Sequence, residues 1–241
     1  MVSDMKVALC LHGLFDSTTD KSSSGITGYE YIKKHILDVY DTDVYIHSWE
    51  TDKASMIESM YNPKKCIFEE QIDFTPLINK KQLNLLKGTP RSPHSILSHF
   101  YSIQKSFKQL YVEPTEIYDI VIKARFDLGQ INRETSPYHV ECIKIELNNL
   151  NKINMASWPD EWMLNEGPPD MWFYSNFENM KLFTKIYDSV ENYMTIGTPF
   201  SDNISNRLGI GNISNASVLY KKFFEDNNLW DDRNQINCLK N

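Results

Sequence analysis

Short apolar runs, each ended by polar or glycine-containing stretches, mark the strands that the chain is expected to form. Three of them have the length and composition of buried strands, and they are residues 6–11, 43–47 and 118–123. Residues 65–68 and 171–174 predict two shorter strands, and residues 138–156 predict one or two more.

A different spacing marks the helices. Between residues 95 and 110 the apolar side chains lie three or four positions apart, which is the period of an amphipathic helix. Ser92 or Ser95 could cap this helix at its amino end. Further helices are predicted over residues 27–36, 176–193 and 216–230.

The order of these elements indicates the fold class. A strand, a helix and a second strand follow one another over residues 6–47, which predicts a parallel pair of strands. No internal repeat interrupts the alternation that follows. We therefore predict an α/β fold, with a single domain over residues 1–241 and a Rossmann-like, mixed but mainly parallel sheet flanked by helices.

Composition and charge exclude some partners. The formal net charge is −7 and no basic block stands out, so a nucleic acid is not expected as a partner. The apolar run of residues 7–11 is too short to span a bilayer, and we expect neither a signal peptide nor a transmembrane segment. Four cysteines without metal-binding spacing are expected to be reduced thiols. Together these features predict a soluble, cytoplasmic protein, in the host cytoplasm if the chain is viral.

The first predicted strand ends in His-Gly, within the stretch VALCLHGLFDS. This is similar to the turn after an early strand of α/β-hydrolases, where a loop amide helps to form the oxyanion hole. Such enzymes need a nucleophilic Ser within G-x-S-x-G and a catalytic His late in the chain. The chain has no such pentapeptide and its last histidine is His139, so an esterase is the weakest of the functions considered.

The stretch IYDIVIKARFDL, residues 117–128, carries a stronger signal. A buried strand leads to Arg125 and Asp127, whose spacing of two places both side chains on one face of an extended chain. Ligands of open α/β sheets bind at the carboxyl ends of the strands. A carboxylate there can hold Mg²⁺ or Mn²⁺, and Arg125 can contact a phosphate or simply pair with Asp127.

Three stretches in order resemble nucleotide-sugar glycosyltransferases of the GT-A type, a group that includes enzymes of lipopolysaccharide and capsule synthesis and relatives in large viruses. They are KVALCLHGLFDS, DVYIHSWE (residues 43–50) and YDIVIKARFDL. A fourth and weaker stretch is PPDMWFYSNFENMKLF, residues 168–183. The chain departs from the family pattern where Arg-x-Asp replaces Asp-x-Asp, which puts metal dependence in doubt.

The resemblance implies a reaction and its partners. A sugar would move from a nucleotide-sugar, most often a UDP- or GDP-sugar, to a glycan or another hydroxyl acceptor, with Mn²⁺ or Mg²⁺ as the cofactor. The nucleotide-binding part would cover about residues 5–130, and the part that binds sugar and acceptor about residues 131–241.

The resemblance also implies roles for particular residues. The loop after the first strand would lie along the nucleotide, and it contains His12, Gly13, Leu14 and Phe15. Trp49 would stack on the base or wall the pocket. Lys105, Lys123 and Arg125 would offer positive charge to the diphosphate, and Asp127 would bind the metal or the sugar diphosphate.

Asp170 is the best candidate for the base that takes the acceptor proton, or for the group that binds the sugar hydroxyls. Glu166 is the second candidate, ahead of Asp160 and Glu161. Three histidines are expected to be structural: His47 near a strand end, and His94 and His99, which are five positions apart on a helix.

Two other functions stay open. A nucleotidyltransferase on a similar sheet would want a glycine-rich loop after the first strand, and the loop here is poor in glycine. A non-catalytic carbohydrate- or nucleotide-binding protein of the same fold would explain the missing second carboxylate.

Overall fold

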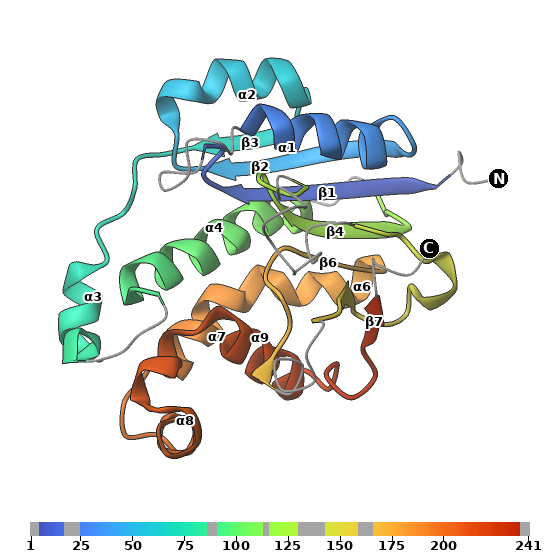
Figure 1. Cartoon of the computed structure of the whole chain (residues 1–241). Helices are drawn as coiled ribbons and strands as arrows, with labels where there is room; N and C mark the ends of the chain where they lie inside the picture. The colour runs from blue at the N-terminus through green and yellow to red at the C-terminus, as the bar shows by residue number, and fades with distance from the viewer. Residues whose placement is uncertain are drawn as a thin grey trace, which may run out of the picture.

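A mixed sheet forms the centre of the computed structural model, which describes residues 5–16, 25–85, 91–112, 116–129, 143–158 and 166–236. Among these residues the sheet has seven strands in the order β3-β2-β1-β4-β6-β5-β7 (Figure 1). The strands are β1 Lys6–Gly13, β2 Asp41–Ser48, β3 Lys65–Phe68, β4 Ile120–Arg125, β5 Asn154–Ala156, β6 Trp172–Ser175 and β7 Asn234–Ile236.

Helices cover both faces of this sheet (Figure 1). They are α1 Gly25–Ile32, α2 Ala54–Tyr61, α3 Thr75–Lys80, α4 Pro93–Tyr111, α6 Phe177–Met180, α7 Ile186–Tyr193, α8 Pro199–Leu208 and α9 Ala216–Asp226. Helices α1 and α2 lie on one face, and α4, α7 and α9 lie on the other. The predicted α/β class and the mainly parallel sheet are therefore confirmed, and the arrangement is compatible with a Rossmann-like fold.

Strand direction changes on one side of the sheet. β1 pairs in parallel with both β2 and β4, and β2 pairs in parallel with β3. β6 is antiparallel to both of its neighbours, β4 and β5. The chain thus runs from β1 outward to β3 and then crosses back to β4, so β1 and β4 flank the point where the strand order reverses. In open α/β sheets this switch point is where ligands bind.

Alternation along the strands separates two hydrophobic clusters. Val7, Leu9 and Leu11 of β1 pack toward α1 and α2. Ala8 and Cys10 pack toward α4, α7 and α9. Because side chains alternate along a strand, the residue after Leu11, at the carboxyl end of β1, faces the α4 side.

Most of the predicted elements are present, with shifted ends. The helix expected over residues 95–110 is α4, and the Ser92 hydroxyl caps it by accepting a hydrogen bond from the Ser95 amide at 3.1 Å. The helix expected over residues 176–193 is broken, because a 3-10 segment, Lys181–Lys185, separates α6 from α7. Within it the Thr184 hydroxyl donates to the Lys181 carbonyl at 2.8 Å and competes with the helical ladder.

α3 lies within residues 72–86, for which the pattern predicts a mixture of loop and helix, whereas α2, α8 and β7 were not predicted. No helix in the described part of the chain is long and apolar enough to cross a membrane. The division into a nucleotide-binding part and an acceptor part stays a prediction.

Candidate functional site

A cavity of about 380 Å³ opens at the carboxyl ends of β1, β2 and β4, beside the switch point. The amino ends of α4 and α9 close its other side. Its wall is formed by His12, Gly13, Leu14, Trp49, Gln71, Arg91, His94, Ser95, Ile96, Ser98, His99, Arg125, Asp127, Asp170 and Ala216.

Arg125 joins two carboxylates in this cavity. Its Nε donates to Oδ1 of Asp127 at 2.8 Å, and its Nη2 donates to the other oxygen of the same carboxylate. Its Nη1 donates to Oδ2 of Asp170 at 3.1 Å. The Arg125 amide also bonds the Met171 carbonyl at 3.2 Å, which holds the segment before β6 against the end of β4. The predicted proximity of Arg125 and Asp127 is confirmed, although Asp127 lies in a turn after the end of β4 and not in the expected extended chain.

The charge of Asp170 is fixed by its surroundings. Burial alone would raise the pKa of this half-buried carboxyl, but the positive groups around it lower the pKa well below the ordinary value. Arg125 has the largest effect, His99 contributes only at a pH at which its ring is protonated, and Lys123 and Arg91 contribute less. Asp170 therefore carries a negative charge at neutral and mildly acidic pH.

Lys123 lies beneath the cavity and does not line it. The side chain is fully buried, and its Nζ donates to the Asp170 carbonyl oxygen. The ammonium also lies over the rings of Phe173 and Tyr220, 5.1 and 5.4 Å from their centroids. Burial lowers the pKa of Lys123 to about 7, while Asp170 acts in the opposite direction.

Two neutral imidazoles meet in the cavity wall. The rings of His12 and His99 lie edge to face, with centroids 5.1 Å apart, and His99 Nε2 is 3.0 Å from the hydroxyl of Tyr220. Burial first, and then Lys123, lowers the pKa of His99 to about 3 and holds the pKa of His12 well below its ordinary value. Neither ring nitrogen of His12 has a hydrogen-bond partner among the described residues.

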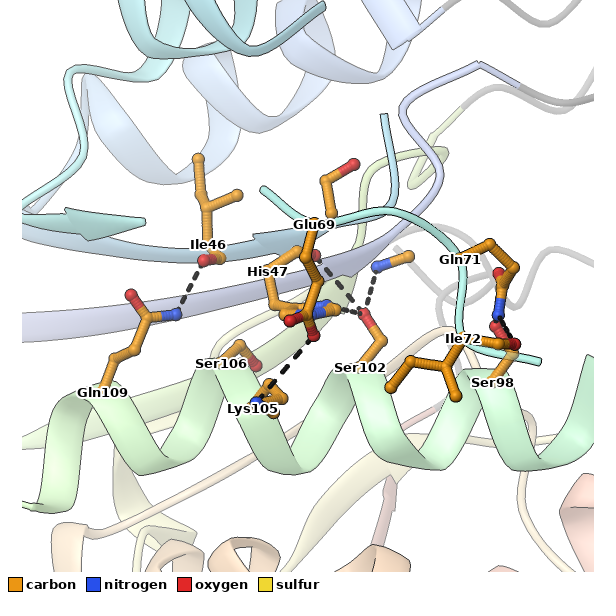
Figure 2. A network of polar contacts seen from close by, with 12 residues as sticks. Ile46, His47, Glu69, Gln71, Ile72, Ser98, Ser102, Lys105, Ser106 and Gln109 are labelled. Carbon is orange, nitrogen blue, oxygen red and sulfur yellow. Dashed lines mark hydrogen bonds and ion pairs between the residues drawn. The ribbon is translucent and has the colours of Figure 1, made fainter. Parts of the chain in front are cut away.

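A polar network holds the carboxyl end of β1 (Figure 2), which includes His12 and Gly13, two residues that were expected in the loop after the strand. The Gly13 amide donates to Ser102 Oγ at 2.8 Å, and that oxygen is 2.7 Å from His47 Nδ1. His47 Nε2 is 2.9 Å from Oε1 of Glu69. Because Glu69 can only accept when ionised, the network is satisfied when His47 donates from Nε2 and accepts the Ser102 hydroxyl proton at Nδ1. The expected structural role of His47 agrees with this geometry.

Most of the predicted site residues line the cavity, and the others lie outside it. His12, Gly13, Leu14, Trp49, Arg125, Asp127 and Asp170 line the cavity. Phe15 is buried on the opposite face of the sheet, where its ring lies 5.8 Å from that of Phe126. Lys105 lies over the Tyr101 ring at 5.0 Å and is 3.9 Å from Glu69.

Among the carboxylates proposed as alternative bases, Glu166 pairs with Arg207 at 2.7 Å and does not line the cavity. Asp160 and Glu161 lie outside the described residues.

His94 and His99, which were expected to be structural, both line the cavity. Residues five apart on a helix point about 140° from each other. Both reach the cavity because it wraps around the amino-terminal turns of α4 instead of following one face. The polar residues Arg91, Ser95 and Ser98 were missed. Arg91 precedes α4 and had no such signal, whereas Ser95 and Ser98 lie three positions apart on the helix and could have indicated this wall.

The contacts of Asp127 and Asp170 determine whether these carboxylates could hold the expected Mn²⁺ or Mg²⁺. Both oxygens of Asp127 and one of Asp170 accept from Arg125. Within the described ranges, no group of three or more His, Cys, Asp or Glu side chains is placed to hold a metal. The guanidinium stands where a cation would stand, so the residues present do not fit a preformed metal site. Metal assistance stays a prediction.

Replacing His12 by Phe is expected to raise the free energy of unfolding by about 1–2 kcal/mol, because a buried polar ring that has no partner among the described residues becomes apolar. The same change at His47 is expected to lower it by about 1–3 kcal/mol, because it leaves Ser102 and Glu69 without their partner. Urea denaturation of the two variants measures both effects. Destabilisation by both changes to a similar extent would show that His12 is bonded in the folded protein.

Gly167 allows the segment that carries Asp170 to lie close to α9. Its φ is +137°, and a Cβ there would come within 1.9 Å of the Ser217 carbonyl oxygen. Gly167→Ala is therefore expected to displace this segment and to destabilise the protein by about 2–4 kcal/mol.

Gly209→Ala is the matched control for this change. Gly209 also has a positive φ, +85°, but among the described residues no atom outside its chain neighbours lies within 4 Å of the added Cβ. Its ψ is 146°, a conformation that glycine alone adopts readily, so backbone strain without a clash is expected to cost about 1–3 kcal/mol. Equal losses in thermal unfolding of the two variants would contradict the close packing at Gly167.

Comparison with known proteins does not assign the chain to a family. No protein-family model matches the chain, and no curated protein matches it significantly.

Proposed function

We propose that the chain is a glycosyltransferase that takes a sugar from a nucleotide-sugar donor bound in this cavity. The observation that carries the proposal is the Arg125–Asp127–Asp170 cluster, which lies in a cavity at the carboxyl ends of parallel strands and at the switch point. Its volume, about 380 Å³, is within the range of pockets that enclose small ligands.

The cluster offers both charges that sugar transfer needs. Negative charge develops on the leaving diphosphate, and Arg125 is a fixed cation in a partly desolvated site. Asp127 and Asp170 offer carboxylate oxygens to sugar hydroxyls, and a carboxylate can also take the proton of the acceptor. The low pKa of Asp170 favours the first of these two roles for that residue, because a weakly basic group is a poor proton acceptor.

Trp49 supports the nucleotide end of the proposed site. Its ring lines the cavity and stacks on Tyr101, with centroids 5.4 Å apart and an interplanar angle of 24°. The stack and the bond from Gly13 to Ser102 hold this wall in place, so a flat aromatic base would meet a preformed surface.

One observation favours a binding protein without catalysis. Because Arg125 already satisfies both oxygens of Asp127, the pair can serve as a closed ion pair that only shapes a carbohydrate pocket. The Ser102–His47–Glu69 network does not favour a hydrolase, because Ser102 is fully buried within α4 and does not line the cavity.

Thermal unfolding with UDP-, GDP- and CMP-sugars, with and without Mn²⁺, separates these functions. A donor at one hundred times its dissociation constant stabilises by about 2.7 kcal/mol, which corresponds to about 5–10 °C for a chain of this size. Asp127→Ala is expected to remove both the shift and the transfer, while Asp38→Ala, which breaks an exposed pair with Lys33, keeps both. Stabilisation by free glycans alone would support the binding protein, and transfer by Asp127→Ala at saturating donor would refute the site.

A further inference from the structure

Two helices begin at the cavity, and both direct their amino ends toward it. α4 has 19 residues and is capped by Ser92, and α9 has 11 residues and is capped by Asn215. Ser95 in the first turn of α4 and Ala216 at the start of α9 form part of the wall. Each helix end carries roughly half a positive charge, which favours an anion beside it.

The charged side chains around the cavity do not cancel the positive charge of the two helix ends. The charge of Arg125 is shared between Asp127 and Asp170, and a second guanidinium, that of Arg91, lies in the wall directly before α4. Arg91 contributes to the lowered pKa values of both Asp170 and His99, so its charge acts across the cavity. The two arginines balance the two carboxylates, and the helix ends make this part of the cavity positive.

His12 provides an independent indication that a ligand binds here. Its side chain is 1% exposed and lines the same cavity, and neither ring nitrogen has a partner within the described part of the chain. A buried polar group without a partner costs free energy, which a ligand can recover by bonding to it. The neutral ring has one N–H to donate, and a phosphate oxygen accepts such a bond without an added proton.

We propose that this end of the cavity is a phosphate subsite formed by Arg91, the amino ends of α4 and α9, and the neutral imidazole of His12. The subsite deepens the proposed function, because the group it holds would be the diphosphate of the donor. It works without a metal ion, since helix ends and a guanidinium supply the positive charge. A phosphorylated acceptor would present the same chemistry.

Titration calorimetry with inorganic pyrophosphate in EDTA tests the subsite without nucleotide or sugar. Saturable binding is expected for the wild type, and Arg91→Gln is expected to weaken it about 10- to 100-fold. His12→Phe is expected to weaken it by a smaller factor while the protein stays folded. Lys34→Gln removes one charge from an exposed residue beyond the opposite face of the sheet and is expected to bind as the wild type does.

Competition identifies the source of the phosphate. Displacement of pyrophosphate by UDP or GDP, and not by a sugar 1-phosphate, assigns the subsite to the donor, and the reverse assigns it to a phosphorylated acceptor. Equal pyrophosphate binding by wild type and Arg91→Gln, or no binding by either, would overturn the subsite.

The two proposals fail in different ways. Binding of a nucleotide-sugar that Arg91→Gln leaves unchanged would overturn the subsite and leave the glycosyltransferase standing. Pyrophosphate binding that depends on Arg91, in a protein that binds no nucleotide-sugar, would support the subsite and overturn the glycosyltransferase.

Discussion

Asp170→Asn is expected to reduce sugar transfer by about 10²- to 10⁴-fold while the protein keeps its fold. The change removes the carboxylate charge that faces the cavity, and Arg125 loses one of its two partners. Both roles considered for Asp170, binding of sugar hydroxyls and acceptance of a proton, depend on that charge. Steady-state rates at saturating donor, with circular dichroism as a check on folding, measure the effect.

The pH profile tests the carboxylate charge on which both roles depend. The pKa of Asp170 in the folded protein is held well below its ordinary value. The folded carboxylate therefore stays charged as the pH falls through the pKa of the unfolded chain, and it loses its charge only at the lower pKa of the folded protein. Activity that depends on hydroxyl binding by Asp170 is therefore expected to persist between pH 7 and pH 5. Asp41→Asn, an exposed change at the amino end of β2, is the matched control. Full activity of Asp170→Asn would remove this residue from the site.

Lys123→Met is expected to increase the stability of the protein at pH 6 by about 1–4 kcal/mol and to reduce transfer. Burial lowers the pKa of Lys123 to about 7, so the unfolded chain binds this proton more strongly than the folded chain does. Methionine removes that penalty and fills similar space, although the Asp170 carbonyl loses its donor. Transfer falls because the segment that presents Asp170 is no longer held from below.

The sign of the pH dependence gives a second measurement. Between pH 7 and about pH 10 the unfolded chain retains the Lys123 proton and the folded chain does not, so stability rises with pH in this window. Urea denaturation of Lys123→Met at pH 6 and pH 9 is expected to lack this rise, whereas the exposed change Lys80→Met is expected to retain it. A destabilised Lys123→Met variant with an unchanged pH profile would show that the buried amine is stably charged in the folded protein.

Strong apolar patterns predicted the elements that form the centre of the fold. β1, β2 and β4 are apolar runs, and α4 has a long apolar face. α2 and α8 bury only two residues each, which gives too weak a period to detect. β7 is a short polar strand that depends on pairing with β5. The antiparallel direction of β6 was not predictable, because all four of its residues are buried and the pattern reads alike in both directions.

The site was predictable where it lies at strand ends. The carboxyl end of a buried strand indicated Arg125 and Asp127, and the resemblance to nucleotide-sugar glycosyltransferases indicated Asp170. Arg91 and His99 could not be placed, because their approach to these residues depends on how the amino end of α4 sits over the sheet. Strand alternation put Lys123 and Arg125 on one face but could not show that only Arg125 reaches the cavity.

The proposed donor site is tested most directly by a crystal structure of the protein with a bound UDP- or GDP-sugar. We predict that the nucleotide lies over the ends of β1 and β2 beside Trp49, with its phosphates within hydrogen-bond distance of Arg91 or Arg125 and its sugar facing Asp170. A nucleotide-sugar bound outside this cavity, or an empty cavity at a donor concentration that supports transfer, would contradict the account.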